Sequence, residues 1–279
     1  MPLTAAPTTR FDDAIARLER VAGGASEFYI RHHERRCCDD ALRLSQLRPG
    51  GRILNIGGRP YLFEFVAREL GLDVETLDLD TGRNPREIAD LGVAVLQVDI
   101  EDPRSRASLD LASYDVICMA EIFEHLRIDL LSTLEFVRSG MRDDAVLYLT
   151  TPNFFYATSI LKAWVQGRSG PSLVAEWSKL ASSGHMGHVR EYAAGELFEF
   201  FGHVGFAIDS FLVRNSRPIE LAGGGILQIP VRMLARFLAS NFDRFGQELV
   251  FVLRRGQPDA VRKAARAQPG SAREDRRSR

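Results

Sequence analysis

Residues 114–126 read Tyr-Asp-Val-Ile-Cys-Met-Ala-Glu-Ile-Phe-Glu-His-Leu. The apolar run at 114–120 is typical of a buried strand, and Glu-x-x-Glu-His follows it directly. Open α/β sheets bind their ligands at the carboxyl ends of strands. If a helix follows this strand, Glu121, Glu124 and His125 share one of its faces, because positions i, i+3 and i+4 are neighbours. We therefore expect these side chains to converge on a proton or a metal ion.

Strands and helices alternate from residue 52 onward. The expected strands are 53–56, 74–77, 93–98, 114–120 and 145–150, and the expected helices include 61–70 and 127–139. This alternation predicts an α/β fold with a doubly wound, Rossmann-like, mostly parallel sheet. Two late strands, at 206–214 and 249–254, bring the sheet to seven strands and can pair antiparallel at its edge. Helices are expected beside them at 196–201 and 226–242.

The chain divides into three expected segments. Residues 1–48 form an N-terminal helical segment, with helices at 11–22 and 26–47. Residues 49–257 form the sheet domain, with an aromatic, partly helical insertion at about 154–190 after the fifth strand. The aromatic side chains of this insertion either form a lid over a ligand or pack into a small helical core. Residues 258–279 are expected to be a disordered basic tail.

Composition and charge narrow the class of protein. The 279 residues are 45% hydrophobic and carry a net charge of -1, which gives no reason to expect a nucleic-acid partner. The tail carries +4 and the remainder -5. Three cysteines, Cys37, Cys38 and Cys118, form no disulfide framework and indicate a reducing compartment. Because there is no apolar signal core or membrane-length apolar run, we expect a cytoplasmic protein without a membrane span. The oligomeric state is not indicated.

Three strand ends carry a ligand-binding pattern. Asn55, Gly57 and Gly58 end the first strand, and glycine there permits a tight turn and close approach of the backbone to a ligand. Asp78 follows Gly57 by 21 residues, at the end of the next strand. A carboxylate at that distance can accept the hydroxyls of a ribose. Asp99 ends the third strand, near the position expected for a purine.

Together these motifs resemble those of the class I S-adenosylmethionine-dependent methyltransferases, from about residue 52 to residue 208. The fifth-strand motif of that family is matched by residues 147–153. Asn55 stands where the family usually has Asp, and Arg59-Pro60 stands where a further Gly is common. The resemblance implies S-adenosylmethionine as cofactor. The cofactor-binding residues that it implies are Asn55, Gly57, Gly58, Asp78, Asp99, Ile100 and Ala120.

The Glu-x-x-Glu-His cluster has three interpretations. The acidic residues merely open a helix, or His125 or His188 is a general base, or the cluster binds a divalent metal. Residues 188–197 resemble the His-x-x-Glu-Tyr segment of small-RNA 2′-O-methyltransferases, which hold a metal with two Glu and two His. Ubiquinone-type O-methyltransferases share the Glu-x-x-Glu-His part. The ligands that this resemblance implies are Glu121, Glu124, His125 and His188, for magnesium or another divalent metal.

The function expected from these patterns is O-methylation. The acceptor is a hydroxyl of a small molecule, a saccharide or a glycolipid, with or without metal assistance. His125, His188 and Glu121 are the expected catalytic residues. An RNA 2′-O-methyltransferase and a non-catalytic S-adenosylmethionine-binding module are the alternatives.

Overall fold

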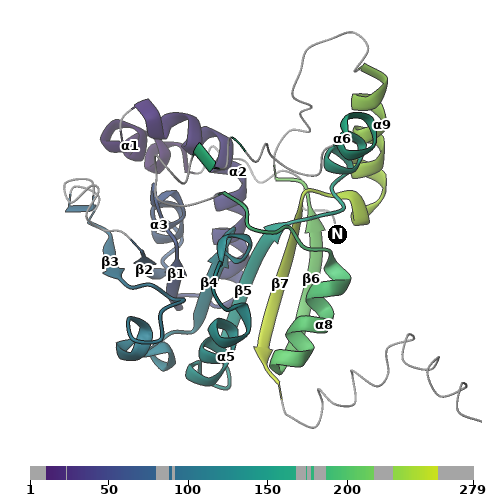
Figure 1. Cartoon of the computed structure of the whole chain (residues 1–279). Coiled ribbons are helices and arrows are strands. Elements are labelled where there is room, and N and C mark those ends of the chain that lie inside the picture. The colour runs from purple at the N-terminus through teal and green to yellow at the C-terminus, as the bar shows by residue number, and fades with distance from the viewer. Residues whose placement is uncertain are drawn as a thin grey trace, which may run out of the picture.

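A seven-stranded sheet forms the centre of the computed structural model (Figure 1). The structure describes residues 11–22, 24–79, 88–89, 92–167, 174, 177–178, 187–216 and 229–256. The strands follow the order β3-β2-β1-β4-β5-β7-β6 across the sheet. Their bounds are β1 (Arg52–Ile56), β2 (Asp73–Asp78), β3 (Ala94–Gln97), β4 (Val116–Ala120), β5 (Val146–Pro152), β6 (Phe206–Arg214) and β7 (Glu248–Arg255).

The sheet is parallel from β3 to β5 and antiparallel at the β7 end. β7 lies between β5 and β6 and pairs antiparallel with both. The predicted doubly wound, mostly parallel, seven-stranded fold is therefore confirmed. The strand predicted at 114–120 begins later, at Val116, because Tyr114 still closes a 3-10 turn by donating its backbone N–H to the carbonyl of Leu111.

Helices cover both faces of the sheet, and the period of two along each strand supplies a core to each face. In β5, Val146 and Tyr148 pack with α1 (Asp12–Ala22), α2 (Gly24–Leu47) and α3 (Leu62–Arg68). Leu147 and Leu149 point to the opposite face, which carries α5 (Leu130–Gly140) and α8 (Ala194–Val204). The two N-terminal helices thus share one hydrophobic core with the sheet.

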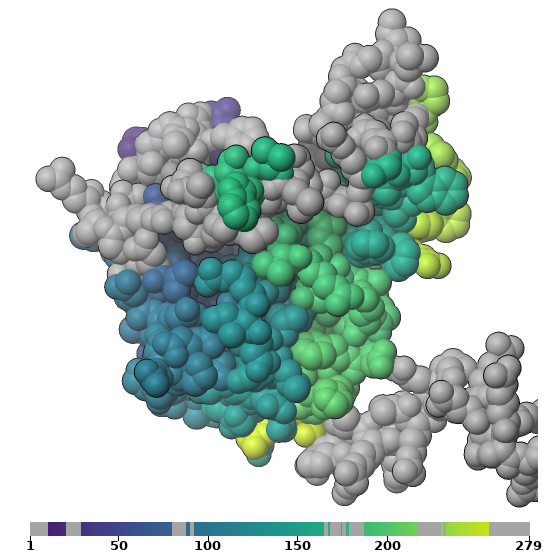
Figure 2. All heavy atoms as spheres, viewed as in Figure 1, coloured from purple at the N-terminus to yellow at the C-terminus, as the bar shows by residue number. Residues whose placement is uncertain are grey.

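Two helices form a smaller unit outside both cores. α6 (Ala157–Gln166) follows β5, and α9 (Ile229–Asn241) precedes β7. They pack together through Ala157, Ala235 and Ala239. The pair projects from one corner of the molecule, at the upper right of Figures 1 and 2. Much of the predicted insertion at 154–190, and the whole tail at 258–279, lie outside the described residues.

No helix in the described part of the chain is both long and apolar enough to cross a bilayer.

The segment directly after β4 is not the α-helix that would place Glu121, Glu124 and His125 on one face. Glu121 adopts a left-handed backbone conformation, with φ 58°, and Phe123–His125 form a single 3-10 turn. The carboxylate of Glu101 then accepts the backbone N–H groups of Arg127 and Ile128, each at 2.6 Å. These contacts keep the chain extended until Asp129 caps α5, so this helix begins at Leu130 and not at residue 127.

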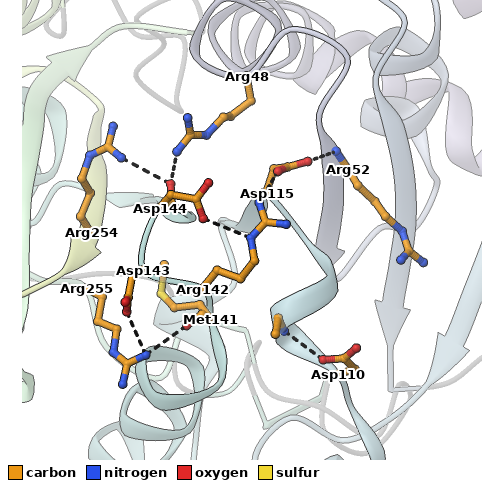
Figure 3. Close-up of polar contacts among 11 residues, drawn as sticks. Arg48, Arg52, Asp110, Asp115, Met141, Arg142, Asp143, Asp144, Arg254 and Arg255 are labelled. Carbon is orange, nitrogen blue, oxygen red and sulfur yellow. Dashed lines mark hydrogen bonds and ion pairs between the residues drawn. The ribbon is translucent and has the colours of Figure 1, made fainter.

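Charged side chains tie together the edge of the sheet at which β1, β4 and β5 begin (Figure 3). Asp115 accepts the backbone N–H of Arg52 at 2.8 Å and forms an ion pair with Arg142. Arg48 and Arg254 both donate to the backbone carbonyl of Asp144. Because these groups are partly exposed, each adds little to stability.

A buried ion network joins α2 to the last strands. Arg214 lies 2.7 Å from the carboxylate of Asp40 and 2.9 Å from that of Glu248. Tyr148 donates its hydroxyl to Asp40 at 2.5 Å, and Ser216 donates to Glu248. All five residues are buried, so these charges and hydroxyls depend on one another for solvation.

Substitution of Arg214 by Met should therefore be strongly destabilising. The change leaves Asp40 and Glu248 buried without their cation, which costs about 3–5 kcal/mol of unfolding free energy. Urea denaturation measures this loss. Arg254→Met is the matched control on the next strand, since Arg254 pairs with Asp209 at a half-exposed position, and we expect a cost of about 1 kcal/mol or less. Equal losses in both variants would contradict the assigned role of the network.

Candidate active site

A cavity of about 380 Å³ opens at the carboxyl ends of β1, β2 and β4. Glu121 and His125 also contribute to its wall. The residues expected from the sequence to bind a cofactor all line this cavity: Asn55, Gly57, Gly58, Asp78, Asp99, Ile100 and Ala120. The structure thus gathers seven positions that are spread over 66 residues of sequence around one space.

The two glycines after β1 are required by close packing. Gly57 has φ 75°, and a Cβ atom there would collide with the side chain of Ile122. A Cβ atom on Gly58 would lie 2.5 Å from Cγ2 of Thr76 and would also collide with Glu64. Any larger residue would displace the loop, so the glycine pair sets the shape of the cavity floor.

The two strand-end aspartates differ in their surroundings. The backbone N–H of Gly58 approaches Oδ2 of Asp78 at 3.5 Å, which links the ends of β1 and β2. Asp99 instead accepts the backbone N–H of Glu101 at 2.9 Å through Oδ1 and so shapes its own loop. Asp78 therefore lies beside the glycine turn, whereas Asp99 has a local structural contact as well as its place in the wall.

A buried carboxyl group lies beneath the glycine turn. Glu64 of α3 accepts hydrogen bonds from Nδ2 of Asn55 at 2.7 Å and from the hydroxyl of Thr76 at 2.6 Å. Burial raises the pKa of Glu64 to about 7. The Asn55 amide is thereby fixed with its nitrogen toward Glu64. Sequence reasoning missed Glu64, because a single acidic residue in a helix gives no signal of burial.

Helix α2 contributes charged groups that sequence reasoning also missed. Arg36 is 5% exposed and lines the cavity together with Tyr29 and Asp40. Its Nε and Nη1 atoms have no hydrogen-bond partner among the described residues. The helical periodicity could have indicated that Arg36 and Asp40 are buried, since both adjoin the apolar stripe that Cys37 and Ala41 form. Arg36 therefore faces the cavity and not the solvent.

Glu124, His125 and His188 converge beside this cavity. They offer one ligand atom each, and these atoms all lie within 4.8 Å of one another. Nε2 of His125 is 3.8 Å and Nε2 of His188 is 3.9 Å from Oε1 of Glu124. Both distances are too long for a hydrogen bond.

Backbone contacts bring His188 to this point. The N–H of Val189 donates to the carbonyl of Glu124 at 2.8 Å, and Tyr192 forms a parallel bridge with Asn153 just after β5. The chain from 187 to 192 therefore runs between the end of β5 and the 3-10 turn. This arrangement explains how a residue 63 positions after His125 reaches it.

The hydrogen bonds of the two imidazoles orient their rings. Nδ1 of His125 lies 3.0 Å from the carbonyl of Gly187, and Nδ1 of His188 lies 3.1 Å from the carboxylate of Glu191. Since carbonyls and carboxylates only accept, we assign the proton of each ring to Nδ1. The lone pair of each Nε2 then faces Glu124. Metal-binding histidines characteristically donate their other ring N–H to such groups.

Glu124 itself is buried, and only one of its two carboxylate oxygens accepts a hydrogen bond from the described residues. Its Oε2 accepts the hydroxyl of Thr151 at 3.0 Å, while Oε1 has no hydrogen-bond partner among the described residues. Burial, followed by the charge of Glu121, raises the pKa of Glu124 well above its usual value. Three electron-pair donors thus meet at a point where a proton or a cation would be stabilised.

Glu121 does not belong to the group of atoms that lie within 4.8 Å of one another. Its carboxylate lies 3.5 Å from the hydroxyl of Thr150 and interacts electrostatically with Arg36 and Glu124. The left-handed backbone at Glu121 separates it from the 3-10 turn that carries Glu124 and His125. Glu121 therefore lies between the cavity with Arg36 and the cluster with His188.

Two further hollows adjoin the cluster, and both are lined by His188 and Glu191. The first, of about 280 Å³, is polar and includes His32, Ser159 and Lys162. The second, of about 1050 Å³, is mostly apolar and is lined by aromatic and aliphatic residues that include Phe154, Phe155, Ile160, Trp164 and Phe245. Phe154, Trp164 and Trp177 are exposed, so the alternative of a buried aromatic core is wrong for these three residues.

Comparison with known families finds a match to the family described as "Methyltransferase domain" over residues 29–210. No curated protein matches the chain. An S-adenosylmethionine-dependent methyltransferase from Archaeoglobus fulgidus has a similar fold, with a TM-score of 0.51 and 16% identity over 81% of this chain and 99% of that chain. A chain of the Haloferax volcanii complex between the Trm112 methyltransferase activator and a putative methyltransferase gives 0.55 and 15%, over 90% and 98%. These two structures support the fold.

The raised pKa of Glu64 predicts a pH-dependent stability. Folded protein keeps the Glu64 proton up to about pH 7, whereas the unfolded chain releases it near 4.5. The folded state binds more protons between these values, so its stability falls as the pH rises through this range. Glu64→Gln removes this loss, which a shift of this size sets at about 3 kcal/mol. Urea unfolding from about pH 5 to about pH 8 measures it.

The control for this experiment is Glu69→Gln, an exposed position one turn later in sequence. Its stability should follow that of the wild type at every pH. If the Glu64→Gln and wild-type curves ran parallel, Glu64 would already be charged in the folded protein, and the assigned burial effect would be wrong.

Proposed function

This chain belongs to the methyltransferase-domain family, and we propose that it uses S-adenosylmethionine to methylate a hydroxyl group with the help of a divalent metal ion. The proposed acceptor is a small molecule, a saccharide or a glycolipid. The observation that carries this proposal is the convergence of Glu124, His125 and His188 between the cavity at the strand ends and the two hollows beyond it.

The residues that line the cavity support the methyl donor as its ligand. S-Adenosylmethionine supplies a reactive methyl group on a sulfonium, between an adenosine and an amino-acid end. Asp78 provides a carboxylate for the ribose hydroxyls, beside the glycine turn. Elsewhere in the cavity wall, Arg36 provides a buried cation whose Nε and Nη1 atoms are unsatisfied among the described residues, which suits the carboxylate at the amino-acid end of the methyl donor.

The remaining cavity residues have supporting roles in this proposal. The amide of Asn55, oriented by Glu64, presents its oxygen to the amino-acid end. Asp99 and Ile100 lie in the wall beyond Asp78, where they border the adenine. Gly57, Gly58 and Ala120 are small residues, and they leave room for the sulfonium in front of β1 and β4.

The cluster suits a divalent cation by its chemistry. Two imidazoles and one carboxylate are a donor set for manganese, cobalt or zinc, and magnesium prefers more oxygen. Glu124 has an unsatisfied buried oxygen there, and Glu121 is a candidate for a further ligand or for a contact with the acceptor. A cation at this place would lower the pKa of an acceptor hydroxyl and fix its position.

The chain's own groups complete the reaction. A hydroxyl is a poor nucleophile until it loses its proton, so the enzyme has to align it with the methyl group and receive that proton. The Nε2 lone pairs of His125 and His188 lie on the path between donor cavity and acceptor hollows. Glu191 and the carbonyl of Gly187 keep these lone pairs directed inward.

The two hollows beyond the cluster favour an acceptor with polar and apolar parts. Ser159, Lys162 and His32 offer hydroxyl, ammonium and imidazole groups next to His188, as a hydroxylated head group requires. Phe154, Trp164 and their apolar neighbours line the larger hollow on the other side of the same histidine. A glycolipid matches this division better than a free saccharide does.

A reducing compartment such as the cytoplasm is part of the proposal. Cys37, Cys38 and Cys118 are buried and free, and burial raises the pKa of each thiol, which keeps it unreactive.

Binding of S-adenosylhomocysteine tests the cofactor site. Asp78→Ala and Arg36→Met should each weaken binding by about tenfold to about a hundredfold, since each removes a charge-assisted hydrogen bond. Calorimetry measures the affinity. Arg35→Met is the matched control, because Arg35 is the exposed neighbour on the same helix and should bind like the wild type. Absence of binding to the wild-type protein would overturn the cofactor assignment for this cavity.

Metal binding tests the cluster independently of activity. We expect the wild-type protein to bind one manganese ion per chain by calorimetry, and His188→Ala to lose this binding by about tenfold or more. His203→Ala, an exposed histidine on α8, should bind as the wild type does. Chelator should abolish methyl transfer to a hydroxylated acceptor, and manganese should restore it. Full activity in chelator, with no manganese uptake, would leave His125 or His188 as a metal-independent base.

A further inference from the structure

Five large apolar side chains of the α6–α9 unit are exposed. We define the α6–α9 surface by five exposed residues: Trp164, Met233, Leu234, Phe237 and Phe242. Trp164 is 86%, Met233 66% and Phe237 56% exposed. The unit that carries them projects from the body of the molecule, as Figure 2 shows. Exposed residues of this size gathered on two adjacent helices indicate a contact with something else.

The geometry of α9 directs these side chains outward. Ala235 and Ala239 face α6. Since successive residues turn by about 100° around a helix, Met233 and Phe237 lie on the opposite side from these alanines. The ring of Phe237 also stacks edge-to-face with that of Phe242, with centroids 6.2 Å apart. The contact with α6 therefore leaves the larger apolar side chains of α9 on its free side.

The charge of the two helices has one sign. Their sequences, ATSILKAWVQ and IPVRMLARFLASN, contain Lys162, Arg232 and Arg236 and no acidic residue. The chain outside the C-terminal tail is acidic, with a net charge of -5. An apolar surface beside a set of cations, on an otherwise acidic body, is suited to an anionic partner with an apolar interior.

We propose that the α6–α9 surface docks onto an anionic lipid bilayer. Trp164, Met233 and Phe237 would enter the boundary between head groups and acyl chains, and Arg236 would contact the anionic head groups. A second copy of the chain is a poorer occupant. In a two-fold interface the cations would meet their own copies, and neither helix has an acidic side chain to neutralise them.

Docking onto a bilayer would also assign a role to the larger, apolar hollow as the entrance for the acceptor. This role rests on the proposed function. Trp164 belongs both to the α6–α9 surface and to the apolar hollow that reaches His188, and Ile160 lines the same hollow one turn earlier. A bilayer held at α6 would lie at the open end of this hollow. A lipid-borne acceptor could then reach the cluster without leaving the membrane completely.

Flotation of the full chain with vesicles tests the docking. Wild-type protein should float with phosphatidylcholine vesicles that contain about one third phosphatidylglycerol, and high salt should weaken this binding. The double variant Met233→Ser with Phe237→Ser should lower the partition coefficient by about tenfold or more. Arg236→Glu should lower binding to the anionic vesicles. Ile128→Ser, at an exposed apolar position outside this surface, should bind as the wild type does.

Three outcomes would overturn the proposal. Wild-type protein that stays in solution has no bilayer affinity, and a double variant that binds like the wild type uses another surface. If the wild-type protein is a dimer in the ultracentrifuge and the double variant a monomer, with no vesicle binding by either, the surface joins two copies. Calorimetry with S-adenosylhomocysteine shows that each variant is folded, and it keeps a failure of docking distinct from a failure of the proposed function.

Discussion

The buried cation of Arg214 is the constraint on which the carboxyl edge of the sheet depends. It lies between Asp40 of α2 and Glu248 of β7, and it therefore joins helix α2 to the last two strands of the chain. Asp40 is one helical turn after Arg36, so the same contact sets where Arg36 points. The buried cations Arg36 and Arg214 are thus matched in number by the buried acids Asp40 and Glu248. Nε and Nη1 of Arg36 still have no hydrogen-bond partner among the described residues, so they can bind an anion.

The candidate active site also contains buried carboxyl groups whose hydrogen bonding within the described part of the chain is incomplete. Glu64 and Glu124 each have one satisfied oxygen, since Oε1 of Glu64 accepts from Asn55 and Thr76 and Oε2 of Glu124 accepts from Thr151. The other oxygen of each carboxyl group has no hydrogen-bond partner among the described residues, which costs free energy. The two groups differ in position, because Glu64 lies under the glycine turn and Glu124 faces two imidazoles. Such a cost, placed beside a cavity, is what a binding site for a proton or a cation requires.

The sequence predicted what local pattern determines and missed what packing determines. The strands and the positions of Asp78 and Asp99 follow from the alternation of apolar runs and turns, and the structure has them at one cavity. Arg36 and Glu64 act through contacts with elements far away in sequence, which no local period reveals. The helix predicted from residue 127 begins only at Leu130, because Glu101 takes the N–H groups of Arg127 and Ile128, again a tertiary contact. His188 was suggested by a family resemblance alone.

Charge and apolar surface together favour one orientation of the molecule. The acidic body would be repelled by anionic head groups, whereas the α6–α9 unit carries only cations. An approach to a bilayer would thus turn the carboxyl edge of the sheet, where β5 runs into α6, toward the lipid (Figure 1). The cavity proposed for the methyl donor opens at the same edge, with the cluster of Glu124 and His188 between it and the apolar hollow. A lipid-borne acceptor would then reach the cluster from the side of the molecule to which α6 is attached, which is also the side that would face the bilayer.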